Sequence, residues 1–137
     1  MLEVDKVLRL KERGIRWIKS WSEGQVFELG RCWFHHGLFA TDHHAKKMLQ
    51  RFNHSILYGH THDIQFYSSH GYRPSDVLLA GSLGCLCKIP QRYLRGALTR
   101  WSQAITLFTF DKASGDFQFD VLRLHDHKLI ADNKVWS

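Results

Sequence analysis

Residues 31–62 read RCWFHHGLFATDHHAKKMLQRFNHSILYGHTH and contain two short apolar runs with a helical segment between them. The first run spans 31–35 and the second 55–58, and both have the length of a strand. Asp42 can cap the intervening helix, and Asn53 ends it. Strand, helix and strand in this order predict a βαβ unit, in which two parallel strands are joined by a right-handed crossover.

Histidines follow both predicted strands. Residues 59–62, Gly-His-Thr-His, come directly after the second strand, and alternate residues of an extended segment point the same way. His36 follows the first strand, and Gly37 after it permits a close approach of the backbone. Neutral imidazole is a common ligand of borderline metals, and ligands of such units gather at the carboxyl ends of the strands. The pattern predicts a metal site built from His36, His60 and His62, with solvent-facing loop histidines as the alternative.

Further histidines are candidates for contact with phosphate. His43 and His44 open the helix, where the helix dipole attracts phosphate and an imidazole can donate a hydrogen bond to it. A solvated first turn is an equal alternative there. His35 can replace His36 as a ligand, and at least one of these two is expected to be a core or capping residue. We take His35 and His44 as the candidate phosphate-binding residues.

The second half of the chain alternates or runs apolar at strand length. Four segments fit this pattern, at 63–67, 76–80, 104–110 and 116–124. The residues between the last two, Asp-Lys-Ala-Ser-Gly, predict the turn of a β-hairpin. His-Asp-His-Lys at 125–128 predicts a further turn. The fold class expected is therefore α/β, a βαβ unit followed by antiparallel strands and a hairpin.

The N-terminal part contains weaker signals. Apolar residues recur at helical spacing over 3–13, and Gly14 stands where a C-terminal cap would be. Residues 15–18 are predicted as a strand, 22–24 as a turn and 25–29 as a further strand.

Composition indicates one globular domain, 1–137. Apolar residues make up 44% and charged residues 23%, which is ordinary for a globular protein. The apolar runs are too short to span a membrane, the N-terminus does not resemble a signal peptide, and three cysteines make no disulfide framework. A cytoplasmic location is expected. The net charge of +6 favours phosphate-bearing partners such as nucleic acid, although the scattered cations fit equally well with no specific partner.

Two smaller features remain open. Cys85 and Cys87 are separated by one residue, which is tighter than the usual spacing of zinc ligands, and no second pair occurs. A buried thiol pair near a strand end is the favoured interpretation. Trp101 after Arg100 is interpreted as a packing aromatic, with stacking on a nucleic-acid base as the alternative.

Taken together, these elements resemble the calcineurin-like metallophosphoesterases. The resemblance is carried by Phe-His-His-Gly at 34–37, His-Ala at 44–45 and Ile-Leu-Tyr-Gly-His-Thr-His at 56–62. Downstream, Gly-Ser-Leu-Gly-Cys-Leu-Cys at 81–87, Arg-Trp at 100–101 and the closing hairpin are similar to the phage-associated branch of that family. The resemblance covers nearly the whole chain.

The resemblance implies a sandwich of two sheets flanked by helices, with two divalent metals at the site. Such metals bind phosphate oxygens and generate a hydroxide for in-line attack. It implies that His36 and His60 serve one metal and His62 the other. The expected metal is Mn²⁺, with Zn²⁺, Fe²⁺ or Ni²⁺ as alternatives.

Other parts of the family pattern are missing. No Asp-x-His element precedes the first histidine cluster, and neither Gly-Asp-x-x-Asp nor Gly-Asn-His occurs in the sequence. By resemblance, these elements supply the bridging aspartate, the asparagine ligand and the histidine that protonates the leaving group. The chain thus corresponds to the C-terminal half of the family domain, and we expect it to hold no catalytic residue of its own.

Two functions follow from this expectation. The first is a metal-dependent phosphoester hydrolase that is completed by a separate N-terminal half, or of which these residues are a part, and that acts on a phosphoester such as nucleic acid. The second is a catalytically incompetent binding module for nucleic acid or protein. A half-fold exposes a sheet edge and a core face, and a homodimer would cover them.

Overall fold

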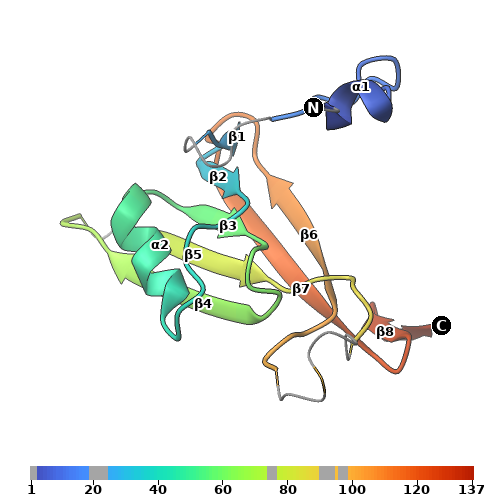
Figure 1. The fold of residues 1–137 in the computed structure, drawn as a ribbon. Helices are drawn as coiled ribbons and strands as arrows, with labels where there is room; N and C mark the ends of the chain where they lie inside the picture. Colours follow the sequence, from blue (N-terminus) through green and yellow to red (C-terminus); the bar gives the residue numbers. More distant parts are fainter. Residues whose placement is uncertain (1–2, 19–24, 74–76, 90–94, 96–98) are drawn as a thin grey trace.

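The computed structural model describes residues 3–18, 25–73, 77–89, 95 and 99–137 (Figure 1). This part of the chain contains two β-sheets and few helical residues, which confirms the α/β class. The elements in chain order are α1 (Val4–Val7), β1 (Phe27–Leu29), β2 (Cys32–His35), α2 (His44–Phe52), β3 (Ile56–Tyr58), β4 (Ile64–His70), β5 (Val77–Leu83), β6 (Ala104–Phe110), β7 (Phe117–His125), β8 (Lys128–Ala131) and β9 (Lys134–Trp136).

The first sheet has the strand order β1-β2-β3-β5-β4. β2 and β3 are parallel, with Trp33 opposite Ile56, and α2 makes the crossover between them. The βαβ unit expected from residues 31–62 is therefore confirmed. β5 is also parallel to β3, whereas β1 and β4 are antiparallel edge strands. Three strands of this sheet consequently end at the same edge.

The start of α2 differs from the expectation. No side chain of the N-cap residue closes the first turn, and the carboxylate of Asp42 instead pairs with Arg100 at 3.0 Å. The prediction that Asp42 caps the helix is wrong. The N–H of Ala45 donates to Oε1 of Gln65 on β4, at 3.0 Å, and Nε2 of Gln65 donates to the carbonyl of Asp42. The side chain of Gln65 thus supplies the hydrogen bonds at the start of α2. The residues next to the helix in the sequence do not reveal this partner.

The main core lies between α2 and one face of the first sheet. Asn53 ends the helix in the left-handed conformation, with φ 47°, as the sequence predicts. The fully buried apolar side chains of this core are Ala45, Met48, Leu49, Ile56, Tyr58 and Ala80.

In the second sheet β6, β7, β8 and β9 are antiparallel neighbours, and the hairpin of β6 and β7 faces the first sheet on the side opposite α2 (Figure 1). Phe34 meets Phe108 with ring centroids 5.0 Å apart, and Phe66 meets Phe119 at 5.5 Å. The hairpin of β6 and β7 turns where the sequence predicts, since the N–H of Gly115 donates to the carbonyl of Asp111. Two facing sheets with α2 outside are compatible with a sandwich.

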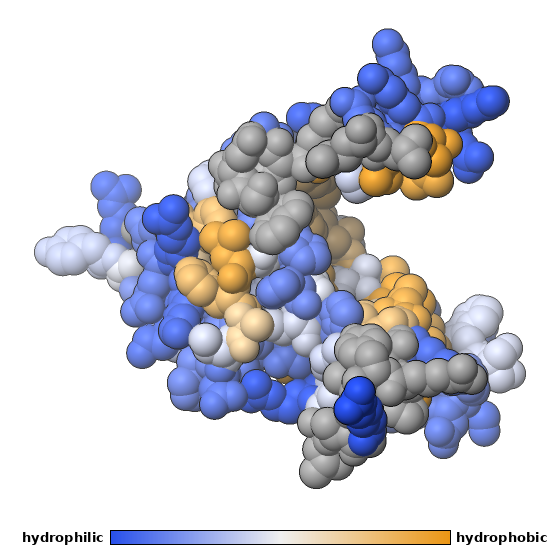
Figure 2. Space-filling view, viewed as in Figure 1, coloured by the Kyte–Doolittle hydropathy of each residue, from blue (hydrophilic) through white to orange (hydrophobic). Residues whose placement is uncertain are grey.

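The N-terminal expectations are met only in part. The helix expected over 3–13 is regular only over α1, and turns follow it. The strand expected at 15–18 is wrong, because these residues pair with no described strand and the side chains of Ile15 and Trp17 are about half exposed. The strand expected at 25–29 is confirmed as β1, and the turn expected at 22–24 lies outside the described residues. The arm with α1 extends away from both sheets across an open space (Figures 1 and 2).

Candidate metal centre

The candidate site lies where the parallel strands β2, β3 and β5 end. Three loops meet there, at residues 36–37, 59–63 and 84–87. The N–H of Gly59 donates to the carbonyl of His36 at 3.2 Å, and the N–H of Gly84 donates to the carbonyl of Asp63 at 2.9 Å. The loops are therefore tied to one another through their backbones, and the side chains that they carry share one edge of the sheet.

His36 and His60 lie in direct contact. Nε2 of His36 is 2.9 Å from Nδ1 of His60, and the two rings meet edge to face. Two imidazoles on one tetrahedral zinc, each with a bond of about 2.0–2.1 Å, would hold their nitrogens roughly 3.3 Å apart. The observed spacing is close to that value, so a small rotation of either ring would accommodate an ion.

The environment of His36 favours the form that binds metal. Burial lowers the pKa of His36, and the nearby charges of His60, His35 and His62 lower it further. A lowered pKa favours the neutral ring, which is the form of imidazole that ligates metals.

Gly37 makes this contact possible. A Cβ atom on Gly37 would lie 2.4 Å from Cβ of His60 and 3.0 Å from the ring of Tyr58, and its φ is +116°. The close approach expected at this glycine is therefore present. By contrast, a Cβ atom on Gly59 would meet nothing within 4 Å.

His35 helps to shape the same loop. Its Nδ1 accepts a hydrogen bond from the N–H of Gly37 at 2.9 Å, and its ring packs against Phe52 at 5.2 Å. His35 thus acts in the local fold, as expected of one member of the pair. Its contact with phosphate stays a prediction.

The ring nitrogens of His36, His60 and His62 do not all lie within 4.8 Å of one another, so the structure does not bring the predicted triad together. The ring of His62 meets Trp101 edge to face, with centroids 4.5 Å apart, which fits a packing role for this tryptophan. Nδ1 of His62 is buried and has no hydrogen-bond partner in the described part of the chain. An unsatisfied buried polar atom costs roughly 1–3 kcal/mol, so a group that binds this nitrogen would stabilise the fold.

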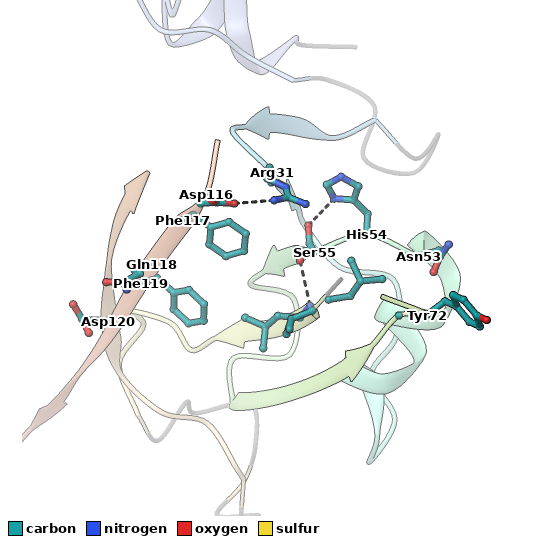
Figure 3. Close-up of a pocket in the computed structure, with 14 residues that line it drawn as sticks. Arg31, Asn53, His54, Ser55, Tyr72, Asp116, Phe117, Gln118, Phe119 and Asp120 are labelled. Atoms are coloured by element: carbon teal, nitrogen blue, oxygen red, sulfur yellow. Dashed lines mark hydrogen bonds and ion pairs between the residues drawn. The ribbon is translucent and has the colours of Figure 1, made fainter. Parts of the chain in front are cut away.

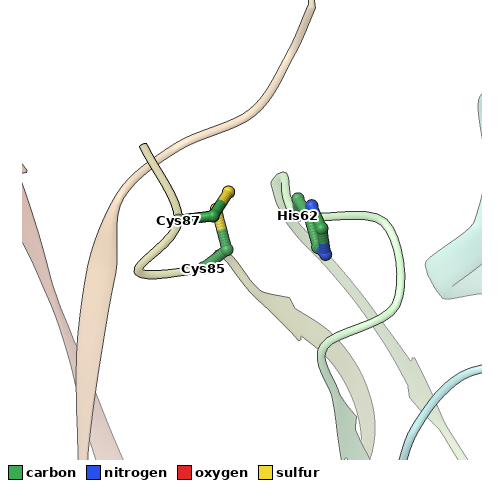
Figure 4. Close-up of side chains that lie close together, drawn as sticks. All are labelled: His62, Cys85 and Cys87. Carbon is green, nitrogen blue, oxygen red and sulfur yellow. The ribbon is translucent and has the colours of Figure 1, made fainter. Parts of the chain in front are cut away.

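Cys85 and Cys87 lie beside His62 (Figure 4). Their Sγ atoms are 3.1 Å apart, and both lie within 4.8 Å of a ring nitrogen of His62. Burial raises the pKa of the Cys85 thiol to about 11, and its hydrogen bond with Cys87 contributes to the rise. The pair follows a strand, as expected, but both residues are partly exposed rather than buried, and they adjoin the candidate ligand His62, a contact that the sequence pattern does not indicate.

His44 is buried in a polar network with Tyr58 and Asp63. Nε2 of His44 lies 3.0 Å from Oδ2 of Asp63, and its Nδ1 contacts the hydroxyl of Tyr58. A carboxylate only accepts, so Nε2–H donates to Asp63, and Nδ1 pairs with the hydroxyl of Tyr58. Both ring nitrogens therefore have partners within the protein, and phosphate binding by His44 stays a prediction.

Asp63 is a buried carboxylate that sequence reasoning did not single out. Burial by itself raises its pKa, but hydrogen bonds from Thr61 and His44 and the charge of His44 outweigh this, and the pKa lies below its ordinary value. The hydroxyl of Thr61 donates to Oδ1 at 2.6 Å, and the hydroxyl of Ser82 donates to the backbone carbonyl of Asp63 at 2.8 Å. The network locks the loop that carries His60 and His62.

A pocket of about 470 Å³ opens over these loops, and its lining includes His44, His60, His62, Arg100 and Trp101. Its lining also contains the carboxylate of Asp63, so the pocket presents both imidazoles and charged groups of either sign. A larger groove, of about 1110 Å³, lies between the two sheets near the start of β5 and β7 (Figure 3). That groove is lined by Val77, Phe117 and Phe119 among others and contains none of the candidate ligands.

Comparison of the chain with protein-family models, with curated proteins and with solved structures finds no match. In the part of the chain that the structure describes, neither helix has the length and apolar character needed to cross a bilayer.

Proposed function

We propose that the chain supplies the histidine ligands of a metal-dependent phosphoester hydrolase. The observation that carries the proposal is the contact between His36 and His60, whose ring nitrogens lie 2.9 Å apart where two parallel strands end. The resemblance of these segments to the calcineurin-like metallophosphoesterases, within a fold compatible with a sandwich, supports the same reading.

In this proposal His36 and His60 hold one divalent ion, with Mn²⁺ as the first choice, and His62 contributes to another. A bound divalent metal would polarise a phosphate oxygen and make its bound water more acidic. The chain itself orients the imidazoles through the backbone bonds between the loops. The guanidinium of Arg100 lines the same pocket but is paired with Asp42 at 3.0 Å, so it would bind a phosphate group only by exchanging that partner.

The negative ligands of such a site would come from a complementary N-terminal half. Asp63, the carboxylate of the loop that carries His60 and His62, is already engaged by Thr61 and His44. The apolar side chains of Phe66 and Val77 are about half exposed, and the groove between the sheets is open. A second segment packed there would bury this surface.

The metal site is tested by calorimetric titration of Mn²⁺ into the purified chain. We expect His36→Ala and His60→Ala each to abolish measurable binding, because each removes half of the ligand pair. His70→Ala is the matched control, since His70 is an exposed histidine at the end of β4, away from these loops. Binding that is unchanged in His36→Ala or His60→Ala would contradict the assignment.

The activity is tested with a chromogenic phosphodiester and Mn²⁺. We expect little turnover by the isolated chain and a gain when a polypeptide that carries the missing carboxylates is added. If no such half restores turnover, the half-enzyme proposal fails.

A second candidate is a self-associating binding module. The open groove and the exposed apolar residues favour it, because a second copy of the chain could cover them. The net charge of +6 would suit nucleic acid as its ligand. Light scattering should then show a dimer, whereas a monodisperse monomer would count against this candidate.

A further inference from the structure

We propose that His62, Cys85 and Cys87 form a separate site for a thiophilic divalent cation, with Zn²⁺ as its natural occupant. The inference shares His62 with the proposed function but requires neither the His36–His60 pair nor phosphoester hydrolysis. It assigns to the cysteines a role that their spacing in the sequence does not suggest.

The distances suit a single ion. Zinc binds sulfur at about 2.3 Å and nitrogen at about 2.0–2.1 Å, so tetrahedral ligands would be roughly 3.5–3.8 Å apart. Here the sulfurs are 3.1 Å apart, and both lie within 4.8 Å of the ring nitrogen (Figure 4). To bind one ion, the two sulfurs would have to move slightly apart and the imidazole nitrogen slightly closer to them.

The backbone holds the three residues in place. The N–H of Cys85 donates to the carbonyl of Ser102 at 3.0 Å, and the N–H of Ser102 donates to the carbonyl of His62 at 2.9 Å. The side chain of Gln103 donates to the carbonyl of Cys87 at 2.8 Å. One short segment before β6 therefore ties both ligand loops together, so the site is largely formed before an ion binds.

The chemistry of the donors selects the metal. Thiolates prefer zinc and other soft or borderline ions, whereas Mn²⁺ is best suited by the oxygens of carboxylates, carbonyls and water. On binding, each thiol gives up its proton to solvent as its sulfur bonds the ion, so two protons leave for each ion taken up. Three protein ligands leave a fourth position for water. The unsatisfied nitrogen of His62 is a second, independent sign that this corner accepts a ligand.

The test uses Co²⁺ as a spectroscopic probe of the reduced full chain under anaerobic conditions. Bound thiolates produce a sulfur-to-cobalt charge-transfer band in the near ultraviolet, and we expect this band in the wild-type protein. Cys85→Ser and Cys87→Ser should each lower its intensity by about half, and the double variant should remove it. Cys32→Ala is the control and should leave the band unchanged, because Cys32 is fully buried on β2.

A double variant His36→Ala and His60→Ala separates this inference from the proposed function. It should lose Mn²⁺ binding and keep the charge-transfer band. Zn²⁺ should displace Co²⁺ and bleach the band.

A measurement on the wild-type chain guards against variants that do not fold. Zn²⁺ should slow the alkylation of Cys85 and Cys87 at least about tenfold, as followed by mass spectrometry, because the bound thiolates are no longer free nucleophiles. Absence of the band in the reduced wild type, its persistence in the double cysteine variant, or alkylation at an unchanged rate would each overturn the proposal.

Discussion

At the scale of single residues, the buried contact between Asp63 and His44 fixes the loop that carries His60 and His62. The position of Asp63 in the sequence does not suggest this role. Asp63 follows His62 directly and stands before β4, where a polar residue ordinarily marks a turn. Its side chain is instead buried, and it accepts from Thr61 and His44. The loop that presents two candidate ligands is thus anchored by a charge that is fully hydrogen-bonded.

We predict that Asp63→Asn lowers the free energy of unfolding at pH 7 by about 1–3 kcal/mol, because it replaces charge-assisted hydrogen bonds of a buried group. Urea denaturation measures this. Asp116→Asn is the matched control. The carboxylate of Asp116 pairs with Arg31 on the surface, and an exposed pair of this kind contributes only about 0–1 kcal/mol.

The stabilisation by Asp63 should also depend on pH. The pKa of Asp63 is lowered in the folded state, so its stabilisation is fully present above the ordinary aspartate value of about 3.9 and is lost as the pH falls through the folded value. The difference in stability between wild type and Asp63→Asn should therefore shrink below about pH 4. A difference that stays constant from pH 7 to pH 3 would show that the carboxylate is not held by these partners.

The candidate ligands were predictable to different degrees. His36 and His60 each follow a strand of a βαβ unit, and parallel strands end at one edge, so their convergence follows from pattern alone. The contacts of His62 with the two cysteines could not be predicted from the pattern. Cys85 lies beside His62 because β5 is parallel to β3, and the sequence gives no direct sign of that pairing.

At the scale of elements, the loop after β2 depends on one glycine. Gly37 has a positive φ, and its missing side chain leaves room for Cβ of His60. The loop after β3 also contains a glycine, but the space around Gly59 is open. Substitutions at Gly37 and Gly59 therefore test whether the crowding at Gly37 constrains the loop after β2.

We predict that Gly37→Ala lowers the free energy of unfolding by about 1–3 kcal/mol, the range typical of overpacking. It should also weaken Mn²⁺ binding roughly 10–100-fold, as residues that orient metal ligands do. Gly59→Ala should leave both quantities nearly unchanged. Thermal denaturation and calorimetry check the pair, and equal effects of the two variants would mean that the crowding at Gly37 does not position His60.

The hydrophobic pattern predicted well those helices and strands whose partners lie nearby in the sequence. The βαβ unit and the hairpin of β6 and β7 are closed by local connections, and their bounds agree with the expectation. The segment 15–18 has an apolar pattern but no strand beside it, so alternation alone is not sufficient to make a strand. The start of α2 was missed for a related reason, since its partner Gln65 lies on a distant strand.

At the scale of the whole molecule, burial is unevenly distributed between the two sheets. The fully buried apolar residues lie mainly on α2, β3 and their neighbours, whereas Ala104 is the sole member of this class among the described residues of the second sheet. Phenylalanines join the sheets at a few points and leave the groove between them open. Local stability follows the density of buried contacts, so the two sheets should open with different free energies.

We predict that amide hydrogen exchange, followed by mass spectrometry, is slowest in β3 and β5 and fastest in β8 and β9. The strands β6 and β7 should be intermediate, because one face of this hairpin packs on the first sheet. If a second polypeptide covers the groove, protection of β7 and of the start of β5 should rise when that partner is added, or with concentration if the partner is another copy. Equal and slow exchange across both sheets of a dilute monomer would mean that the two sheets form one cooperative unit, and the structural support for a missing partner would be lost.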